Sequence, residues 1–461
     1  MEALSNPATI QKSRLGFHYF PDTLHYREID LQKWIPQLKS LGASWLVLQS
    51  PTDRAIPEAF LRGLVDNGIE PIIHFNYSLA NVVDLNEANP ILSAYTRWGV
   101  HGVIFFDRPN ARASWPSSVW AQQDLVECFL ERFLPLANLA LQSGLVPIVP
   151  PLEPKGSYWD TAFLRSFLEA LENHKQIQLQ KSIMLAAYSW SGNHSLNWGV
   201  GGPENWPDTR PYFTPVNGQD QCGFRIFDWY QTIVKAVMGK TCPIILLGAG
   251  SSGDPVHNYK EPTSPDELTK TTLAIAKLLN GENVQDPVDD GIVLYPIPSE
   301  VVSCNFWVLS ASASSPYARQ AWYQEEGQNL PSVQVIKNWK LGSKPDMEPS
   351  GNNKTNSSHK NFVHSTKNSS SSQPIQHYLL LPLYEWGVAD WHLEVIQPFV
   401  KKHHPTIGFS LEEAALASRV TIIGNSQTFP EEQVNRLRQS GCSVDRISGD
   451  GTSIASQLAK R

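Results

Sequence analysis

The sequence contains no apolar run that approaches the ~20 residues needed to cross a membrane as a helix. Residues 1–14 also lack the apolar core of a secretory signal peptide. Lysine and arginine are scattered along a chain whose formal net charge is -7, so the concentrated basic surface of a nucleic-acid-binding protein is missing. We therefore expect neither a membrane span nor a nucleic-acid partner, and a cytoplasmic location by default.

Motifs for metals and cofactors are missing as well. No Gly-rich phosphate loop follows the first expected strand, and no Gly-x-Ser-x-Gly nucleophile motif occurs. The five cysteines lie far apart and form no CxxC or zinc-type spacing; they are Cys128, Cys222, Cys242, Cys304 and Cys442. The sequence thus predicts no disulfide framework, no metal site and no cofactor.

Aromatic residues, by contrast, are plentiful, with 15 Trp, 14 Tyr and 18 Phe. Most such residues enlarge hydrophobic cores. At an open rim they also suit flat, apolar ligand faces, sugars included.

Composition divides the chain into two folded parts. Residues 341–374 consist mainly of Ser, Asn, Lys, Gly and Pro, with almost no large apolar side chain. Such a segment buries too little surface to offset the entropy of ordering, so it predicts a disordered linker. We expect one domain over residues 1–340 and a second over residues 375–461.

The first domain alternates short apolar runs with helical patterns, as parallel βα units do. Helices are expected at 31–41, 57–67 and 122–142, each closed by a glycine. Strands are expected at 15–20, 45–49, 71–75, 102–106, 146–149, 183–188 and 243–247, with the eighth at either 291–295 or 303–309. Eight units predict a (β/α)₈ TIM barrel of the α/β class, since the competing doubly wound sheet needs a Gly-rich loop after its first strand.

The second domain alternates in the same way. Its expected strands are 378–383, 406–409, 420–423 and 444–447, and its expected helices are 391–401, 411–417, 430–439 and 453–460. This order predicts a small α/β domain with a parallel sheet.

Four stretches of the first domain, 31–51, 98–110, 243–250 and 303–310, resemble the clan of retaining glycosidases built on a TIM barrel. That resemblance implies one catalytic Glu at the end of strand four and another at the end of strand seven. Strand four here ends in Asp107-Arg108-Pro109-Asn110, so Arg108 stands where the acid/base is expected. Strand seven ends in Gly248-Ala249-Gly250, so Gly248 stands at the nucleophile position. Because retaining hydrolysis needs two carboxyls about 5 Å apart, we expect that mechanism to be absent.

Other carboxylates leave a second interpretation open. Asp107 closes strand four and Glu153 follows strand five, so both are expected at the rim where barrel active sites lie. They could act as acid and base at the wider separation of an inverting enzyme. In the alternative, Asp107 pairs with Arg108 and Glu153 caps a loop. Glu204, in the loop after strand six, and Asp254, in the loop after strand seven, are each expected to be solvated loop charges.

Candidate ligand-binding residues gather at the same rim. His18 on strand one and His74 on strand three alternate with apolar neighbours, so they either face the barrel axis or act as structural histidines. As a metal-ligand pair they lack a carboxylate partner. The expected substrate-binding set is His18, His74, Arg108, Asn110, Tyr188, Trp190, Trp206 and Trp307, in which Trp307 is equally suited to core packing.

Residues 420–459 resemble one copy of the cell-wall-binding repeat found on Gram-positive bacterial surface proteins. The matching features are the Val-Thr-Ile-Ile-Gly strand, the acidic helix 430–439, the strand over 441–447 and the Gly449-Asp450 turn. The resemblance implies a bacterial protein, a cell-wall polymer as partner and association with the cell surface. Those repeats act as triplets, whereas this chain holds a single copy, so a dimerisation or docking module is the alternative.

Three functions follow from these observations. We favour a carbohydrate-binding pseudoenzyme, because the usual glutamate pair is replaced at both positions. The alternatives are a divergent glycoside hydrolase that uses Asp107 and Glu153, and a protein-interaction scaffold without a sizeable aromatic-lined cleft. The barrel alone does not choose among them, and whether the protein is an enzyme stays open.

Overall fold

The computed structural model describes residues 13–121, 124–256, 264–289, 291–324, 327–342, 375–382, 390–403, 405–449 and 451–459. The chain divides into two compact units, a barrel unit and a C-terminal unit, which are described separately. Most of the predicted linker, residues 343–374, lies outside the described residues, so the linker stays a prediction.

The barrel unit contains a closed barrel of eight parallel strands, so the predicted TIM barrel is confirmed. Closure comes from β1, which pairs with β2 on one side and with β10 on the other. The strands are β1 (Leu15–His18), β2 (Trp45–Ser50), β3 (Glu70–Phe75), β4 (Gly102–Phe105), β5 (Val146–Val149), β6 (Met184–Tyr188), β7 (Ile244–Ala249) and β10 (Val301–Phe306).

The eighth barrel strand is therefore the later of the two predicted alternatives. The earlier run, 291–295, contains the two-residue strand β9 (Val293–Leu294) instead. It pairs antiparallel with β8 (Val284–Gln285) in a small ribbon that is not part of the barrel. Val293 and Tyr295 are exposed there, so this run is not buried as a barrel strand is.

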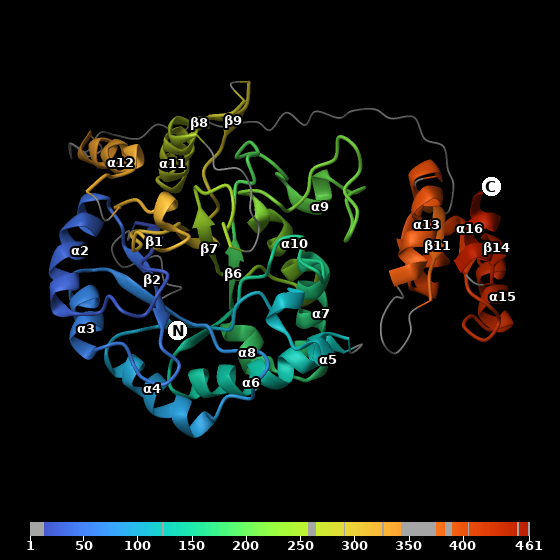
Figure 1. Ribbon diagram of the computed structural model, residues 1–461, viewed down its shortest axis with the longest axis horizontal. Helices are drawn as coiled ribbons and strands as arrows, with labels where there is room; N and C mark the ends of the chain where they lie inside the picture. The colour runs from blue at the N-terminus through green and yellow to red at the C-terminus, as the bar shows by residue number, and fades with distance from the viewer. Residues whose placement is uncertain are drawn as a thin grey trace, which may run out of the picture. The chain divides into compact units, whose positions relative to one another are not determined.

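Helices follow the strands and surround the barrel (Figure 1). The longer ones are α2 (Glu28–Ser40), α3 (Glu58–Asp66), α4 (Leu85–Arg97), α6 (Leu125–Gln142), α7 (Asp160–Asn173), α10 (Ile226–Met238), α11 (Pro265–Leu279) and α12 (Pro331–Gly342). The short ones are α5 (Ser117–Trp120), α8 (Ile177–Ser182) and α9 (Gly202–Asn205), with 3₁₀ turns at Arg112–Ser114 and Ala318–Gln320. In the part of the chain that is described, none is long and apolar enough to span a bilayer.

The barrel interior is a packed core that becomes polar toward the carboxyl ends of the strands. On β6, Met184, Ala186 and Tyr188 alternate along the strand, and all three belong to one buried cluster. Tyr188 is the last of them, and its neighbours in that cluster include Trp190 and Trp307. The aromatic side chains of this cluster therefore lie next to the residues that follow the strand ends.

The C-terminal unit is a four-stranded parallel sheet in the order β12-β11-β13-β14, as the predicted α/β class requires. Along β11, Tyr378 and Leu380 belong to one buried cluster and Leu379 and Leu381 to another, so both faces of the sheet are covered. The elements are β11 (Ile375–Leu380), α13 (Asp390–His403), β12 (Thr406–Gly408), α14 (Leu411–Ala414), β13 (Ala417–Ile423), α15 (Glu431–Gln439), β14 (Ser443–Ile447) and α16 (Gly451–Ala459). The resemblance to a wall-binding repeat covers β13 to α16, and wall binding stays a prediction.

Candidate functional site

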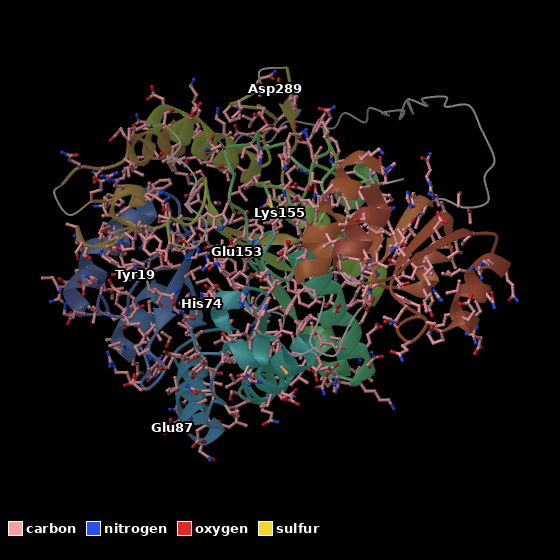
Figure 2. All side chains as sticks on the ribbon, turned by 45° about the vertical axis from the view of Figure 1, so that its right-hand side comes forward. Tyr19, His74, Glu87, Glu153, Lys155 and Asp289 are labelled. Carbon is pink, nitrogen blue, oxygen red and sulfur yellow. The ribbon has the colours of Figure 1, made fainter. Side chains whose placement is uncertain are left out.

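Four carboxyl-terminal strand ends bring charged and aromatic side chains to one mouth of the barrel. Asp107 and Arg108 follow β4, Glu153 follows β5, Tyr188 ends β6 and Asp254 follows β7. Glu153 and His74 lie within the barrel unit in Figure 2. This is the end of a TIM barrel at which catalytic and binding residues are found.

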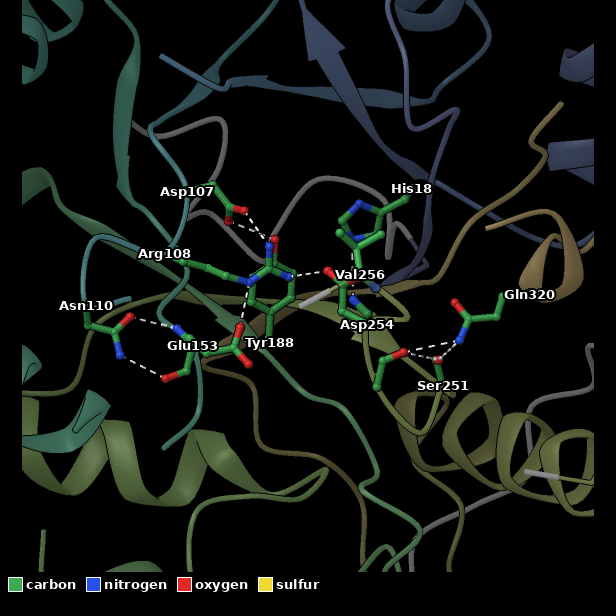
Figure 3. Close-up of polar contacts among 12 residues, drawn as sticks. His18, Asp107, Arg108, Asn110, Glu153, Tyr188, Ser251, Asp254, Val256 and Gln320 are labelled. Atoms are coloured by element: carbon green, nitrogen blue, oxygen red, sulfur yellow. Dashed lines mark hydrogen bonds and ion pairs between the residues drawn. The ribbon is translucent and has the colours of Figure 1, made fainter. Parts of the chain in front are cut away.

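The guanidinium of Arg108 contacts three carboxylates at once (Figure 3). Its Nη1 lies 2.7 Å from Oδ2 of Asp107, and its Nη2 lies 2.6 Å from Oδ2 of Asp254. Its Nε lies 2.7 Å from Oε2 of Glu153. Every side of the planar guanidinium therefore faces a carboxylate, and only about 4% of Arg108 is exposed.

Tyr188 completes the surroundings of this cation. The Cζ atom of Arg108 lies 4.3 Å from the centre of the Tyr188 ring, and the Tyr188 hydroxyl donates a 2.8 Å hydrogen bond to Oδ1 of Asp107. Burial alone would lower the pKa of Arg108, but the adjacent carboxylates, Asp107 foremost, outweigh burial and raise that pKa. The arginine is thus permanently charged, and with three ionised carboxylates the cluster would carry a formal charge of -2.

The backbone that holds Arg108 is strained. Phe106 and Arg108 have φ values of 70° and 45°, in the left-handed region that non-glycine residues avoid. Hydrogen bonds from the amide of Phe106 to the carbonyl of Phe75 and from the amide of Arg108 to that of Pro151 hold the segment in place. Such residues cost on the order of 1–3 kcal/mol each, so the ion pairs and these hydrogen bonds together must stabilise the turn.

The two histidines of the mouth are buried and neutral. Nε2 of His74 lies 2.9 Å from the carbonyl oxygen of Phe106, which can only accept, so Nε2 carries the proton. Nε2 of His18 accepts a 3.3 Å hydrogen bond from the amide of Gly248. Burial lowers the pKa of both histidines, for His18 well below its usual value. Among the described residues, no three His, Cys, Asp or Glu side chains are placed to hold a metal ion.

Arg108 separates two spaces. The inner one has a volume of about 120 Å³, below the range of roughly 300–1,000 Å³ that is usual for ligand sites. It is bordered by His18, Gln49, His74, Asp107, Arg108, Tyr188, Asp254, Trp307 and Tyr317, among others. The outer space, which we call the outer cleft, has about 530 Å³ and lies within that range. Its walls include Arg108, Arg112, Glu153, Lys155, Trp190, His194 and Ser252.

The loop after β5 forms one wall of the outer cleft and is held firmly. The side-chain oxygen of Asn110 accepts from the amide of Glu153, and the side-chain nitrogen of Asn110 donates to the carbonyl of Glu153, each over 2.8 Å. Asp160 is fully buried and accepts hydrogen bonds from the amide of Lys155 and the side chains of Gln221 and Tyr230. Burial raises the pKa of Asp160 to about 6. These contacts fix the positions of Glu153 and Lys155.

The end of β7 has no room for a side chain at Gly248. Its φ is 71°, and a Cβ atom there would lie 2.5 Å from Cη2 of Trp190 and closer still to Cζ3 of the same ring. Trp190 itself stacks on Tyr188, with ring centres 5.2 Å apart. The position that the glycosidase resemblance assigns to the nucleophile is therefore covered by an indole ring.

The predicted site residues divide into four groups. His18, His74, Asp107, Tyr188 and Trp307 border the inner cavity, Glu153 and Trp190 border the outer cleft, and Arg108 borders both. Asn110 borders neither space, but its side chain donates a hydrogen bond to the carbonyl of Glu153. Trp206 also borders neither, because its indole nitrogen donates to the carbonyl of Val200 in its own loop.

Two loop carboxylates were expected to be solvated, and one of them is not. Glu204 is exposed, but Asp254 is 1% exposed and paired with Arg108, so the expectation for Asp254 was wrong. Its partner lies 146 residues earlier in the chain, and no local pattern around Asp254 marks that pairing. Of the two roles predicted for Glu153, the ion pair with Arg108 tests neither.

Comparisons with known proteins find distant structural similarity. No protein-family model and no curated protein matches the chain. The chain is similar to a monomeric β-xylosidase from Caulobacter crescentus, with 11% identity and a TM-score of 0.42 over 72% of this chain and 68% of that one. It is similar to an endo-β-1,3-glucanase from Sorangium cellulosum, with 13% identity and a TM-score of 0.38 over 70% of this chain and 97% of that one. A D-psicose 3-epimerase from Clostridium cellulolyticum matches with 9% identity and a TM-score of 0.37 over 72% of this chain and 98% of that one.

Proposed function

We propose that the barrel unit is a carbohydrate-binding protein that lacks the retaining glycosidase mechanism and holds its ligand in the outer cleft. The observation that carries this proposal is the position of Arg108, whose guanidinium lies between Asp107, Glu153 and Asp254. A glycosidase needs the space between two carboxyls for the scissile bond. Here that space holds a charged side chain of the protein itself.

The end of β7 supports the same conclusion. A retaining enzyme needs a second carboxyl about 5 Å from the acid/base so that it can attack the anomeric carbon. Gly248 carries no nucleophile, and Trp190 covers the place that a longer side chain would need. Reaction by the retaining route would require both Arg108 and Trp190 to move.

The walls of the outer cleft favour a polar ligand with one apolar face. Trp190 is 5% exposed and contributes an aromatic edge against which the apolar face of a sugar can pack. Glu153, Ser157 and Ser252 contribute hydrogen-bonding groups around it. A cleft of about 530 Å³ also counts against a pure protein scaffold, for which no sizeable cleft is expected.

A divergent hydrolase remains the second candidate because of Glu153. Oε2 of Glu153 contacts Arg108, but the residue also borders the outer cleft and its side chain is 12% exposed. An acid in that position could reach a bound sugar, and Asp107 would have to supply the base across Arg108. An inverting reaction tolerates such a wider separation.

The test is to measure binding and hydrolysis on one panel of oligosaccharides with purified protein. Wild type is compared with Asp107→Ala, Glu153→Ala and the conservative Glu153→Gln, after circular dichroism has shown that each variant is folded. We expect binding without turnover in wild type. Hydrolysis that disappears in an Asp107 or Glu153 variant would overturn the proposal in favour of the divergent hydrolase. The absence of both binding and hydrolysis would favour the protein scaffold.

A further inference from the structure

Three basic side chains, Arg108, Arg112 and Lys155, border the outer cleft. Arg108 is already engaged by Asp107, Glu153 and Asp254, so Arg112 and Lys155 are the basic side chains of the wall that a ligand can use. Building on the carbohydrate-binding function proposed above, we propose that the outer cleft selects an anionic glycan, whose carboxylate or sulfate groups are bound by Arg112 and Lys155.

Arg112 is the basic group most available to a ligand. It opens the 3₁₀ turn Arg112–Ser114, and its amide donates to Oγ of Ser157 on the facing loop over 3.3 Å. The amide of Tyr158 donates to the carbonyl of Asn110 over 2.9 Å and ties the same two loops together. The Arg112 residue is exposed, and within the described ranges no carboxylate lies within ion-pair distance of it. Its backbone is thus fixed at the cleft while its guanidinium is available.

Lys155 lies on the loop after β5, and its ammonium group is held in place by an ion pair. Its Nζ lies 2.6 Å from Oδ2 of the buried Asp220. Burial alone would lower the pKa of Lys155, but the hydrogen bond to Asp220 outweighs it and raises the pKa, so the ammonium stays charged. An ammonium has three donors, and the contact with Asp220 uses one. With a side chain that is 38% exposed, Lys155 can offer the others to a ligand.

The size of the cleft indicates a sugar acid and not a bare inorganic ion. A free phosphate or sulfate would leave most of a 530 Å³ space to water. A glycan can fill that space, with its apolar face against the exposed edge of Trp190 and its anionic group at Arg112 or Lys155. Charge-assisted hydrogen bonds from Arg and Lys are the strong interactions in such a site.

The experiment compares ligands that differ only in charge. Binding of wild-type protein is measured by calorimetry to oligogalacturonate and to its methyl ester, and to sulfated and desulfated heparin oligosaccharides. Polyphosphate serves as a polyanion without sugar. We expect oligogalacturonate to bind at least about tenfold more tightly than its neutral methyl ester, or sulfated heparin than the desulfated form, which keeps only its carboxylates. The affinity of the more acidic sugar should fall as NaCl is raised.

Two arginine variants locate the effect. Arg112→Gln should weaken binding of the acidic sugar about fivefold to tenfold and leave the neutral sugar unchanged. Arg319→Gln is the matched control, because Arg319 is also exposed on a 3₁₀ turn, after β10, and borders neither the inner cavity nor the outer cleft. It should change nothing.

The outcomes separate this inference from the carbohydrate function on which it rests. Equal affinity for acidic and neutral sugars, with no effect of Arg112→Gln, would overturn anion selection and leave carbohydrate binding intact. Equal, Arg112-dependent binding of polyphosphate and acidic sugars would overturn selection for a glycan. An acidic sugar bound equally well by wild type and Arg112→Gln would show that the anion lies elsewhere, and no binding of any sugar would overturn the proposed function itself.

Discussion

Arg108 is the residue on which the charge balance of the barrel mouth depends. Replacing it by Ala leaves Asp107, Glu153 and Asp254 facing one another without their shared cation. Removing one partner from a buried ion pair typically costs about 3–5 kcal/mol. We therefore expect Arg108→Ala to lower the free energy of unfolding by about that amount in urea titrations at pH 7.

Two further variants separate charge from backbone strain at this position. Arg108→Gly also lacks the cation but adopts a φ of 45° without strain, so it should be about 1 kcal/mol more stable than Arg108→Ala. Arg108→Lys keeps one charge but cannot contact three carboxylates with a planar fork, so it should lie between Ala and wild type. If Arg108→Ala were as stable as wild type at pH 7, these ion pairs would contribute nothing to the free energy of unfolding.

Individual residues were predictable from the sequence only where a local pattern marks them. The sequence places Arg108 after strand four and suggests its pairing with Asp107, because the two are adjacent. It does not suggest Asp254, which reaches Arg108 only when β4 and β7 are brought together by barrel closure. Arg112 and Lys155 lie on loops whose paths the sequence does not fix, so their place on the outer cleft could not be predicted.

At the scale of elements, β7 and the loop after β6 are fitted closely to each other. Gly248→Ala would introduce a Cβ against the Trp190 ring at a φ of 71°. Overpacking and strain together should lower the free energy of unfolding by about 2–4 kcal/mol, measured by urea denaturation. Gly239 has an almost identical φ of 70° and nothing within 4 Å of its Cβ position, so Gly239→Ala should show the strain alone. Equal losses in both variants would contradict the contact with Trp190.

The elements themselves were largely predictable, because most strands are compact apolar runs that are buried in the structure. Seven of the eight barrel strands fall at their expected places, and the ambiguity of the eighth arose because two apolar runs compete within 20 residues. The helix expected over 411–417 was too long. It ends at Ala414, and Ala417 already pairs with Ile375 of β11, so sheet pairing takes residues that local helical preference would have kept.

At the scale of the whole molecule, each unit has a hydrophobic core of its own, in the barrel interior and on the two faces of the C-terminal sheet. Separate cores predict separate unfolding, so calorimetry of the full chain should resolve two transitions. Leu437→Ala removes a buried side chain of the C-terminal unit, and Leu246→Ala removes one from the barrel. Each should cost about 2–5 kcal/mol and lower the midpoint of one transition only.

Leu437→Ala should also leave glycan affinity unchanged, because the outer cleft is built entirely from the barrel unit. A single transition lowered by both variants would mean that the two units unfold together, and loss of glycan binding in Leu437→Ala would place part of the ligand site in the C-terminal unit.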